Sequence, residues 1–189
     1  RADVDQRKID GLENSFFRMI AQSLYDKTYD LEYRVQTYEP YREINDLAAE
    51  MKTSGYNPFE NPTGIYFKDG EEAVVIVGNT NGERVSLKVY DFDAIRQGQR
   101  TPDPTSYPLN EGINKLRIAH GGLSYIEYYT PNWKTAPALK LHIASGKVNG
   151  YYDKHRDVSA DWREILNKAT YGCIDIKGDR VNLVFGVNS

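Results

Sequence analysis

The spacing of apolar and polar positions divides the chain into three stretches, 1–56, 57–150 and 151–189. Residues 1–56 have helical spacing, which predicts a helical N-terminal segment. A second helix is expected to open at Pro40, where a missing N–H does no harm, and to stop at Gly55. The two helices would form a helical hairpin. The first of them follows an apolar face made by Leu12, Phe16, Met19, Ile20 and Leu24.

Residues 57–150 have the pattern of short strands separated by turns. Asn81 and Gly82 both tolerate positive φ, so they predict a tight hairpin. The stretch 93–110 contains three prolines and is expected to be a loop. Because no helices separate the strands, we predict an antiparallel β-sandwich or jelly roll rather than a βαβ sheet. The predicted strands lie at 65–67, 73–77, 85–89, 116–118, 123–129 and 139–143.

Residues 151–189 predict one short helix followed by a β-hairpin. Ser159 is a candidate N-cap for a helix through Trp162 and Ile165. Two strands, 173–176 and 181–185, follow it and would be joined by a turn. The hairpin is expected to lead into a further domain. The predicted fold is therefore mainly β with helical additions: an antiparallel sandwich preceded by a helical hairpin and followed by a short helix and a β-hairpin.

Charge and composition exclude two classes of partner. The formal net charge of −3 over 189 residues provides no concentrated excess of Lys and Arg, so we expect no nucleic-acid partner. The longest apolar run, 73–77, is too short to cross a bilayer, so no transmembrane segment is expected. The single cysteine, Cys173, rules out an internal disulfide and is predicted to be a small buried hydrophobe.

Catalytic patterns are lacking in the sequence. There is no H-E-x-x-H motif, which would place two zinc ligands on one helix face, and no G-x-S-x-G elbow. Asp91 with Asp93, or Asp153 with Asp157, could donate oxygens to calcium, the alternative being solvated surface charge. We therefore expect no catalytic residue, metal site or cofactor in this chain. The three histidines are scattered, at His120, His142 and His155.

One aromatic stretch is a candidate binding site. Sugar rings have apolar C–H faces that stack on an aromatic plate, while nearby amide or amino groups bond their hydroxyls. The alternative is structural: the indole of Trp133 would cap the end of the sandwich core. The candidate glycan-binding residues are Tyr129, Asn132, Trp133 and Lys134.

Four ordered segments resemble a known family. They are similar to the N-terminal accessory domain of the enhancin-like, mucin-directed, gluzincin-type zinc metallopeptidases of gut Bacteroides. The helix around Trp162 and the stretch 171–175 are similar to the beginning of that family's peptidase domain. The resemblance covers residues 40–189, and its main segments are Asn61–Phe67, Ser106–Asn114, Tyr128–Pro137 and His142–Asp153.

The resemblance implies a secreted or cell-surface bacterial protein with a C-terminal peptidase domain in the same polypeptide. Zinc would belong to that peptidase domain, whose substrates would carry mucin-type O-glycans. This chain would be a non-catalytic accessory domain that assists glycan binding. The alternative is a structural module that buttresses the peptidase domain and binds no ligand. This second function predicts an exposed apolar strip around Val181, Leu183 and Phe185.

Overall fold

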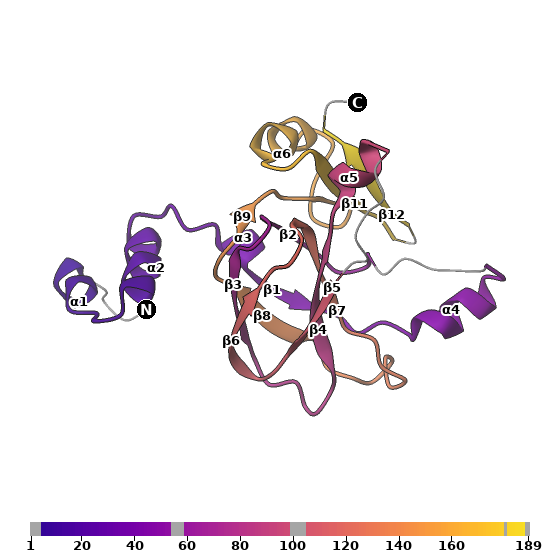
Figure 1. Ribbon diagram of the computed structural model, residues 1–189, viewed down its shortest axis with the longest axis horizontal. Helices are drawn as coiled ribbons and strands as arrows, with labels where there is room; N and C mark the ends of the chain where they lie inside the picture. Colours follow the sequence, from indigo (N-terminus) through magenta and orange to yellow (C-terminus); the bar gives the residue numbers. More distant parts are fainter. Residues whose placement is uncertain (1–4, 54–58, 99–104, 180, 188–189) are drawn as a thin grey trace. The chain divides into compact units, whose positions relative to one another are not determined.

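The computed structural model describes residues 5–53, 59–98, 105–179 and 181–187. Contacts along the chain separate two compact units, residues 1–32 and 33–189. The described residues form twelve strands and six short helices, so the mainly β fold with helical additions is confirmed (Figure 1). Each unit is described separately below.

The first unit consists of two helices, α1 (Gln6–Asp10) and α2 (Ser15–Tyr25). The side chain of Asn14 caps α2, accepting hydrogen bonds from the N–H groups of Phe16 and Phe17. Ile20 is buried while Met19 is 54% exposed. The first predicted helix is confirmed as α2, but of its predicted apolar face only Ile20 is buried, whereas Leu12, Met19 and Leu24 are exposed.

The second unit contains a β-sandwich, in which two sheets enclose the main core. Both sheets are antiparallel throughout. The first has the order β1 (Val35–Tyr38), β8 (Leu139–Ile143), β3 (Glu72–Val77), β6 (Gly112–Arg117). The second has the order β5 (Thr105–Leu109), β4 (Val85–Tyr90), β7 (Gly122–Glu127), β2 (Pro62–Phe67), β9 (Lys147–Val148). The core includes the alternating apolar side chains predicted from the sequence, Val85, Leu87, Val89, Leu139, Leu141 and Ile143.

A third sheet follows the sandwich and contains β10 (Tyr152–Asp153), β11 (Cys173–Lys177) and β12 (Asn182–Gly186). β10 is parallel to β11, whereas β11 and β12 form the predicted antiparallel hairpin. The fully buried side chain of Asn149 ties the hairpin to the sandwich. Its Oδ1 accepts from the N–H groups of Thr170 and Tyr171, and its Nδ2 donates to the carbonyl of Cys173.

The second predicted helix begins later than expected. α4 (Ile44–Glu50) starts at Ile44 and not at Pro40. The predicted stop at Gly55 lies outside the described residues. α3 (Leu31–Arg34) and strand β1 lie between α2 and α4, so the predicted helical hairpin is wrong, and the helices before the sandwich are α1, α2 and α3. The reason is pairing with distant strands: β1 pairs with β8, and Tyr41 donates its N–H to the carbonyl of Tyr128. These bonds hold the segment around Pro40 extended, which local helical spacing cannot reveal.

The Asn81–Gly82 turn has the predicted backbone conformation but not the predicted role. Both residues have positive φ, 54° and 81°. The turn nevertheless joins β3 to β4, which belong to different sheets and do not pair with each other. Turn chemistry determines local dihedral angles, while strand pairing depends on the whole sandwich. The predicted hairpin is therefore wrong.

Two further local predictions are corrected by the structure. The stretch 93–110 is not only a loop, because it contains β5 and most of α5 (Phe92–Arg96). Pro108 is tolerated in β5 because this strand lies at a sheet edge; Pro102 and Pro104 lie outside the described residues. α6 (Trp162–Lys168) has Asp161 and not Ser159 at its N-cap position. The Asp161 carboxylate accepts from the N–H of Val158, which closes a turn before the helix.

Candidate functional site

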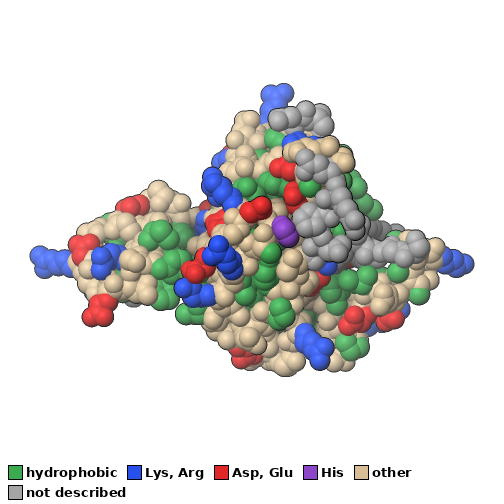
Figure 2. All heavy atoms as spheres, in the orientation of Figure 1, with side chains coloured by type: hydrophobic (Ala, Val, Ile, Leu, Met, Phe, Trp, Pro, Cys, Tyr) green, Lys and Arg blue, Asp and Glu red, His purple; other side chains and the backbone are tan. Residues whose placement is uncertain are grey.

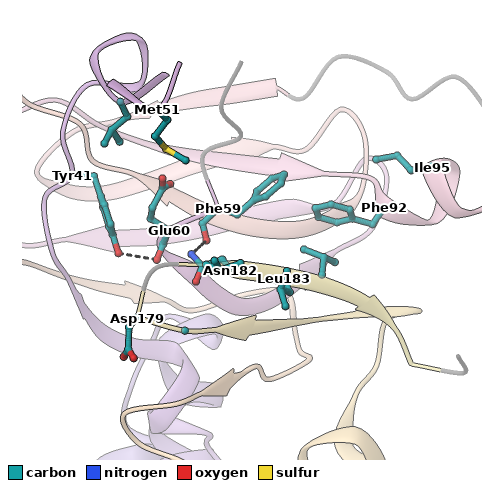
Figure 3. A pocket seen from close by; sticks show the side chains of 13 residues that line it. Tyr41, Met51, Phe59, Glu60, Phe92, Ile95, Asp179, Asn182 and Leu183 are labelled. Carbon is teal, nitrogen blue, oxygen red and sulfur yellow. Dashed lines mark hydrogen bonds between the residues drawn. The ribbon is translucent and has the colours of Figure 1, made fainter. Parts of the chain in front are cut away.

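A groove of about 690 Å³ runs beside β12 (Figure 3). One wall is β12 itself, and the opposite walls come from α4, α5 and the segment before β2. The walls are mostly apolar, and four side chains with polar groups, those of Tyr41, Glu60, Asp179 and Asn182, also line the groove. The apolar lining side chains are those of Leu47, Met51, Phe59, Phe92, Ile95, Val181, Leu183 and Val184.

An aromatic cluster supports the groove from inside the domain. The ring of Phe59 lies 5.0 Å from that of Tyr90, 5.3 Å from that of Phe92 and 5.0 Å from that of Tyr125. Val184 of β12 packs against the same cluster. The Asn182 side chain donates to the carbonyl of Phe59 (2.8 Å), so β12 is fixed to this wall by packing and by a hydrogen bond.

Glu60 places a carboxylate inside the groove wall. The residue is only 6% exposed. Its Oε2 accepts a hydrogen bond from the Tyr129 hydroxyl at 3.0 Å, and its backbone carbonyl accepts one from Tyr41. The buried Oε1 has no hydrogen-bond partner among the described residues. A buried acceptor without a partner is costly, so this atom can take a donor from a molecule that enters the groove.

β12 exposes an apolar strip on the face opposite Val184. The side chains of Val181, Leu183 and Phe185 are 58%, 45% and 45% exposed. This is the exposed strip that the structural alternative predicts. We call these three side chains, together with the groove, the β12 surface. A continuous apolar surface of this kind is typical of a protein contact.

A buried carboxyl lies behind the β12 surface. Asp175 of β11 is 2% exposed and is the cross-strand partner of Val184. Its Oδ1 accepts a hydrogen bond of 2.6 Å from the Tyr125 hydroxyl. Burial raises the pKa of Asp175 to about 7, and the Tyr125 hydrogen bond opposes this rise by stabilising the carboxylate. The hairpin therefore carries a group that titrates near neutral pH.

The four candidate glycan residues are only partly brought together. Asn132, Trp133 and Lys134 are exposed in one turn that follows β7. The Lys134 Nζ lies 5.4 Å from the centre of the Trp133 ring, and Trp133 is 38% exposed. Tyr129 is half-buried, and its hydroxyl is bonded to Glu60 in the groove wall. The turn therefore presents three of the four side chains to solvent.

The candidate calcium carboxylates have protein partners. Asp91 caps α5 through the N–H of Ala94 and also accepts from the Tyr171 hydroxyl. Asp157 pairs with Arg156 at 2.8 Å. Within the described ranges, no three His, Cys, Asp or Glu side chains gather in a metal-binding arrangement. The family's zinc motif is also absent from the sequence, so the residues present do not fit that ion.

The remaining features concern the whole surface. None of the described helices is long and apolar enough to span a membrane. On the face drawn in Figure 2, Lys and Arg side chains are interspersed with Asp and Glu rather than gathered into a patch of one sign. Cys173 is buried, as predicted.

Several site residues were not found by sequence reasoning. Phe59 and Glu60 lie in a segment whose turn formers indicate only a loop, and Phe92 lies between the predicted strand 85–89 and the predicted loop 93–110, where no element was expected. Their convergence depends on how the third sheet packs against the sandwich. Asp175 did leave a signal, because a carboxylate between Ile174 and Ile176 in an apolar strand is unusual.

Residues 31–143 match the family model of the N-terminal domain of M60-like peptidases. A comparison with curated proteins gave no match. Among solved structures, a metallopeptidase from Bacteroides thetaiotaomicron is 32% identical with a TM-score of 0.83, over 100% of this chain and 33% of that chain. A metallopeptidase in complex with Tn antigen is 33% identical with a TM-score of 0.74, over 86% of this chain and 31% of that one.

A more distant structure shows the same fold. The M60 catalytic domain of ZmpC from Clostridium perfringens, in complex with the sialyl T antigen, is 15% identical with a TM-score of 0.64, over 82% of this chain and 34% of that one. The present chain thus spans about a third of the length of these solved structures. The family match covers more than half of the sequence, and the predicted resemblance is confirmed. The chain belongs to the family of N-terminal domains of M60-like peptidases.

Proposed function

We propose that this chain is a non-catalytic accessory domain that packs against the peptidase part of the same polypeptide through the β12 surface. The observation that carries the proposal is the apolar strip of Val181, Leu183 and Phe185, continuous with a groove of about 690 Å³. Water contact with so much clustered apolar surface is unfavourable, and covering it would stabilise both parts.

The family supplies the setting for this proposal. The Bacteroides thetaiotaomicron metallopeptidase is about three times as long as the region that matches this chain. The proposed peptidase part would hold the zinc and the catalytic residues. We further propose an extracellular location and glycoprotein substrates with mucin-type O-glycans, in line with the Tn antigen bound by one related metallopeptidase.

Replacing Leu183 and Phe185 together by serine tests the proposed contact. In this chain alone, where both side chains are 45% exposed, we expect the free energy of unfolding to fall by about 2 kcal/mol, because the buried half of each side chain is lost. In the complete polypeptide, we expect a further loss of about 2–3 kcal/mol, because the other half of each side chain would also be buried there. Urea unfolding of both lengths measures the two values.

The matched control is Ile113→Ser, since Ile113 is 59% exposed on β6, in another sheet. It should change the free energy of unfolding equally at both lengths. A double variant that is no more destabilised in the complete polypeptide than in this chain would contradict the packing role.

A second candidate function is glycan binding at the turn after β7. The specific observation is the exposed Trp133 ring with Lys134 and Asn132 beside it on the same turn. Trp133 does not belong to the sandwich core, which disfavours the alternative that it caps that core. Stacking on the indole and hydrogen bonds from the two neighbours would recognise a sugar ring.

For Trp133→Ala, we expect the affinity for an O-glycan ligand to fall at least about tenfold, since stacking contributes about 1.5 kcal/mol. Calorimetry with glycans that end in N-acetylgalactosamine or sialic acid measures it. Phe17→Ala is the matched control, because Phe17 is 40% exposed and lies in the first unit. Absence of binding to every such glycan, or equal loss in both variants, would reject this function.

A further inference from the structure

β12 has one open backbone edge. It is the last strand of its sheet, paired on one side with β11. Gly178 donates its N–H to the carbonyl of Val181, and Val187 donates to the carbonyl of Gly172. Both bonded pairs have the register of the β11–β12 ladder. Hydrogen-bonded and non-hydrogen-bonded pairs alternate along an antiparallel ladder. Between the Gly178–Val181 pair and the Gly172–Val187 pair, the hydrogen-bonded pairs are therefore those that contain Leu183 and Phe185.

The residues between these pairs face away from β11. The backbone N–H and C=O groups of Asn182 and Val184 therefore point away from β11, in the plane of the sheet, at its open edge. Both residues also line the groove. No described strand pairs with this edge. An open edge flanked by exposed apolar side chains is a template for an added strand.

The groove also specifies the chemistry of what fills it. Its walls are apolar, which suits alternate apolar side chains of an extended segment. The Glu60 Oε1 is buried and lacks a hydrogen-bond partner among the described residues. A Lys or Arg side chain would satisfy this oxygen with a charge-assisted hydrogen bond.

We infer that β12 is completed by an extended, apolar segment of the peptidase part of the same polypeptide, which pairs with Asn182 and Val184 and places a Lys or Arg side chain at Glu60. This inference rests on the proposed function and adds the mode of contact. A solved relative matches all of this chain, β12 included, within a polypeptide about three times as long. A segment tethered in this way has a high effective concentration, which favours it over a second copy of the chain.

Hydrogen exchange at single backbone amides tests the added strand. The outward amide of Val184 is compared with the inward amide of Phe185, in this chain and in the complete polypeptide with residues 1–189 labelled for NMR. We expect the Val184 amide to exchange about 100-fold more slowly in the complete polypeptide, because it gains a ladder hydrogen bond. The Phe185 amide should be protected in both.

Two outcomes overturn the inference. If Val184 exchanges equally fast in both lengths, no strand is added. If Val184 exchanges equally fast while the Leu183 and Phe185 double variant destabilises the complete polypeptide more than this chain, the packing role survives and only the strand pairing fails. If the Val184 amide of this chain alone becomes protected as concentration rises, the occupant is a second copy.

Glu60→Gln tests the basic side chain separately. Glutamine keeps an acceptor of the same shape and removes the charge. In the complete polypeptide, we expect the Val184 amide to exchange about tenfold faster in the variant, because the hydrogen bond to the Lys or Arg side chain would lose its charge assistance. This chain alone should show no change at that amide. An unchanged rate in the complete polypeptide would exclude a Lys or Arg partner.

Discussion

Asn149→Ala is expected to lower the free energy of unfolding of residues 33–189 by about 3–5 kcal/mol. The Asn149 side chain is fully buried and bonds three backbone groups, those of Thr170, Tyr171 and Cys173. Alanine would leave the N–H of Tyr171 and the carbonyl of Cys173, both in buried residues, without these partners, and it would also remove the bond to the N–H of the exposed Thr170. Each lost partner costs more than the hydrogen bond itself contributes, because the remaining group stays desolvated.

Urea unfolding of the variant measures this loss. Asn132→Ala is the control, since Asn132 is exposed and its change should stay within about 0.5 kcal/mol. Equal stability of the two variants would contradict the role of Asn149 as the link between the sandwich and the hairpin. Loss of β12 amide protection in Asn149→Ala, with the sandwich amides still protected, would locate the effect in the third sheet.

Raising the pH from about 4 to about 8 is expected to destabilise the domain through Asp175 by about 4 kcal/mol. The carboxyl has a pKa of about 7 in the folded state, well above its ordinary value of 3.8. The folded state therefore binds one more proton than the unfolded state between these two values. Its stabilising contribution is complete below the unfolded pKa and is lost as the pH rises through the folded pKa.

The contribution is isolated by comparing the protein with Asp175→Asn. Asparagine keeps an acceptor for the Tyr125 hydroxyl, which donates at 2.6 Å, and cannot ionise. The difference in unfolding free energy between the two proteins should shift in favour of the asparagine variant as the pH rises from about 4 to about 8. Parallel pH profiles would contradict the burial of an ionisable Asp175.

The alternation of apolar and polar residues predicted individual strands, because the face that a strand buries depends on its own side chains. The alternation of Val85, Leu87 and Val89 identified a strand whose buried face lies in the core. Pairing with distant strands was not visible in the sequence. Segment 35–38 became a strand through β8, and the Asn81–Gly82 turn joined two sheets rather than two paired strands.

One part of the candidate site was also predicted from the sequence, and another part was not. The exposed strip of Val181, Leu183 and Phe185 was predicted from the structural alternative, in which a peptidase domain would cover these side chains. The groove was not, because Phe59 and Phe92 reach β12 only after the third sheet packs on the sandwich. The prolines of the stretch 93–110 also hid β5, whose edge position makes Pro108 acceptable.

Hydroxyl-radical labelling of this chain and of the complete polypeptide, read by mass spectrometry, shows whether the β12 surface is covered in the complete polypeptide. Phe185 is 45% exposed here, and Trp133, which is 38% exposed on a separate turn, serves as the internal reference. If the β12 surface packs against the peptidase part, Phe185 and Leu183 should be oxidised readily in this chain and protected in the complete polypeptide, while Trp133 should react equally in both. Equal oxidation of Phe185 and Leu183 at both lengths would contradict that packing.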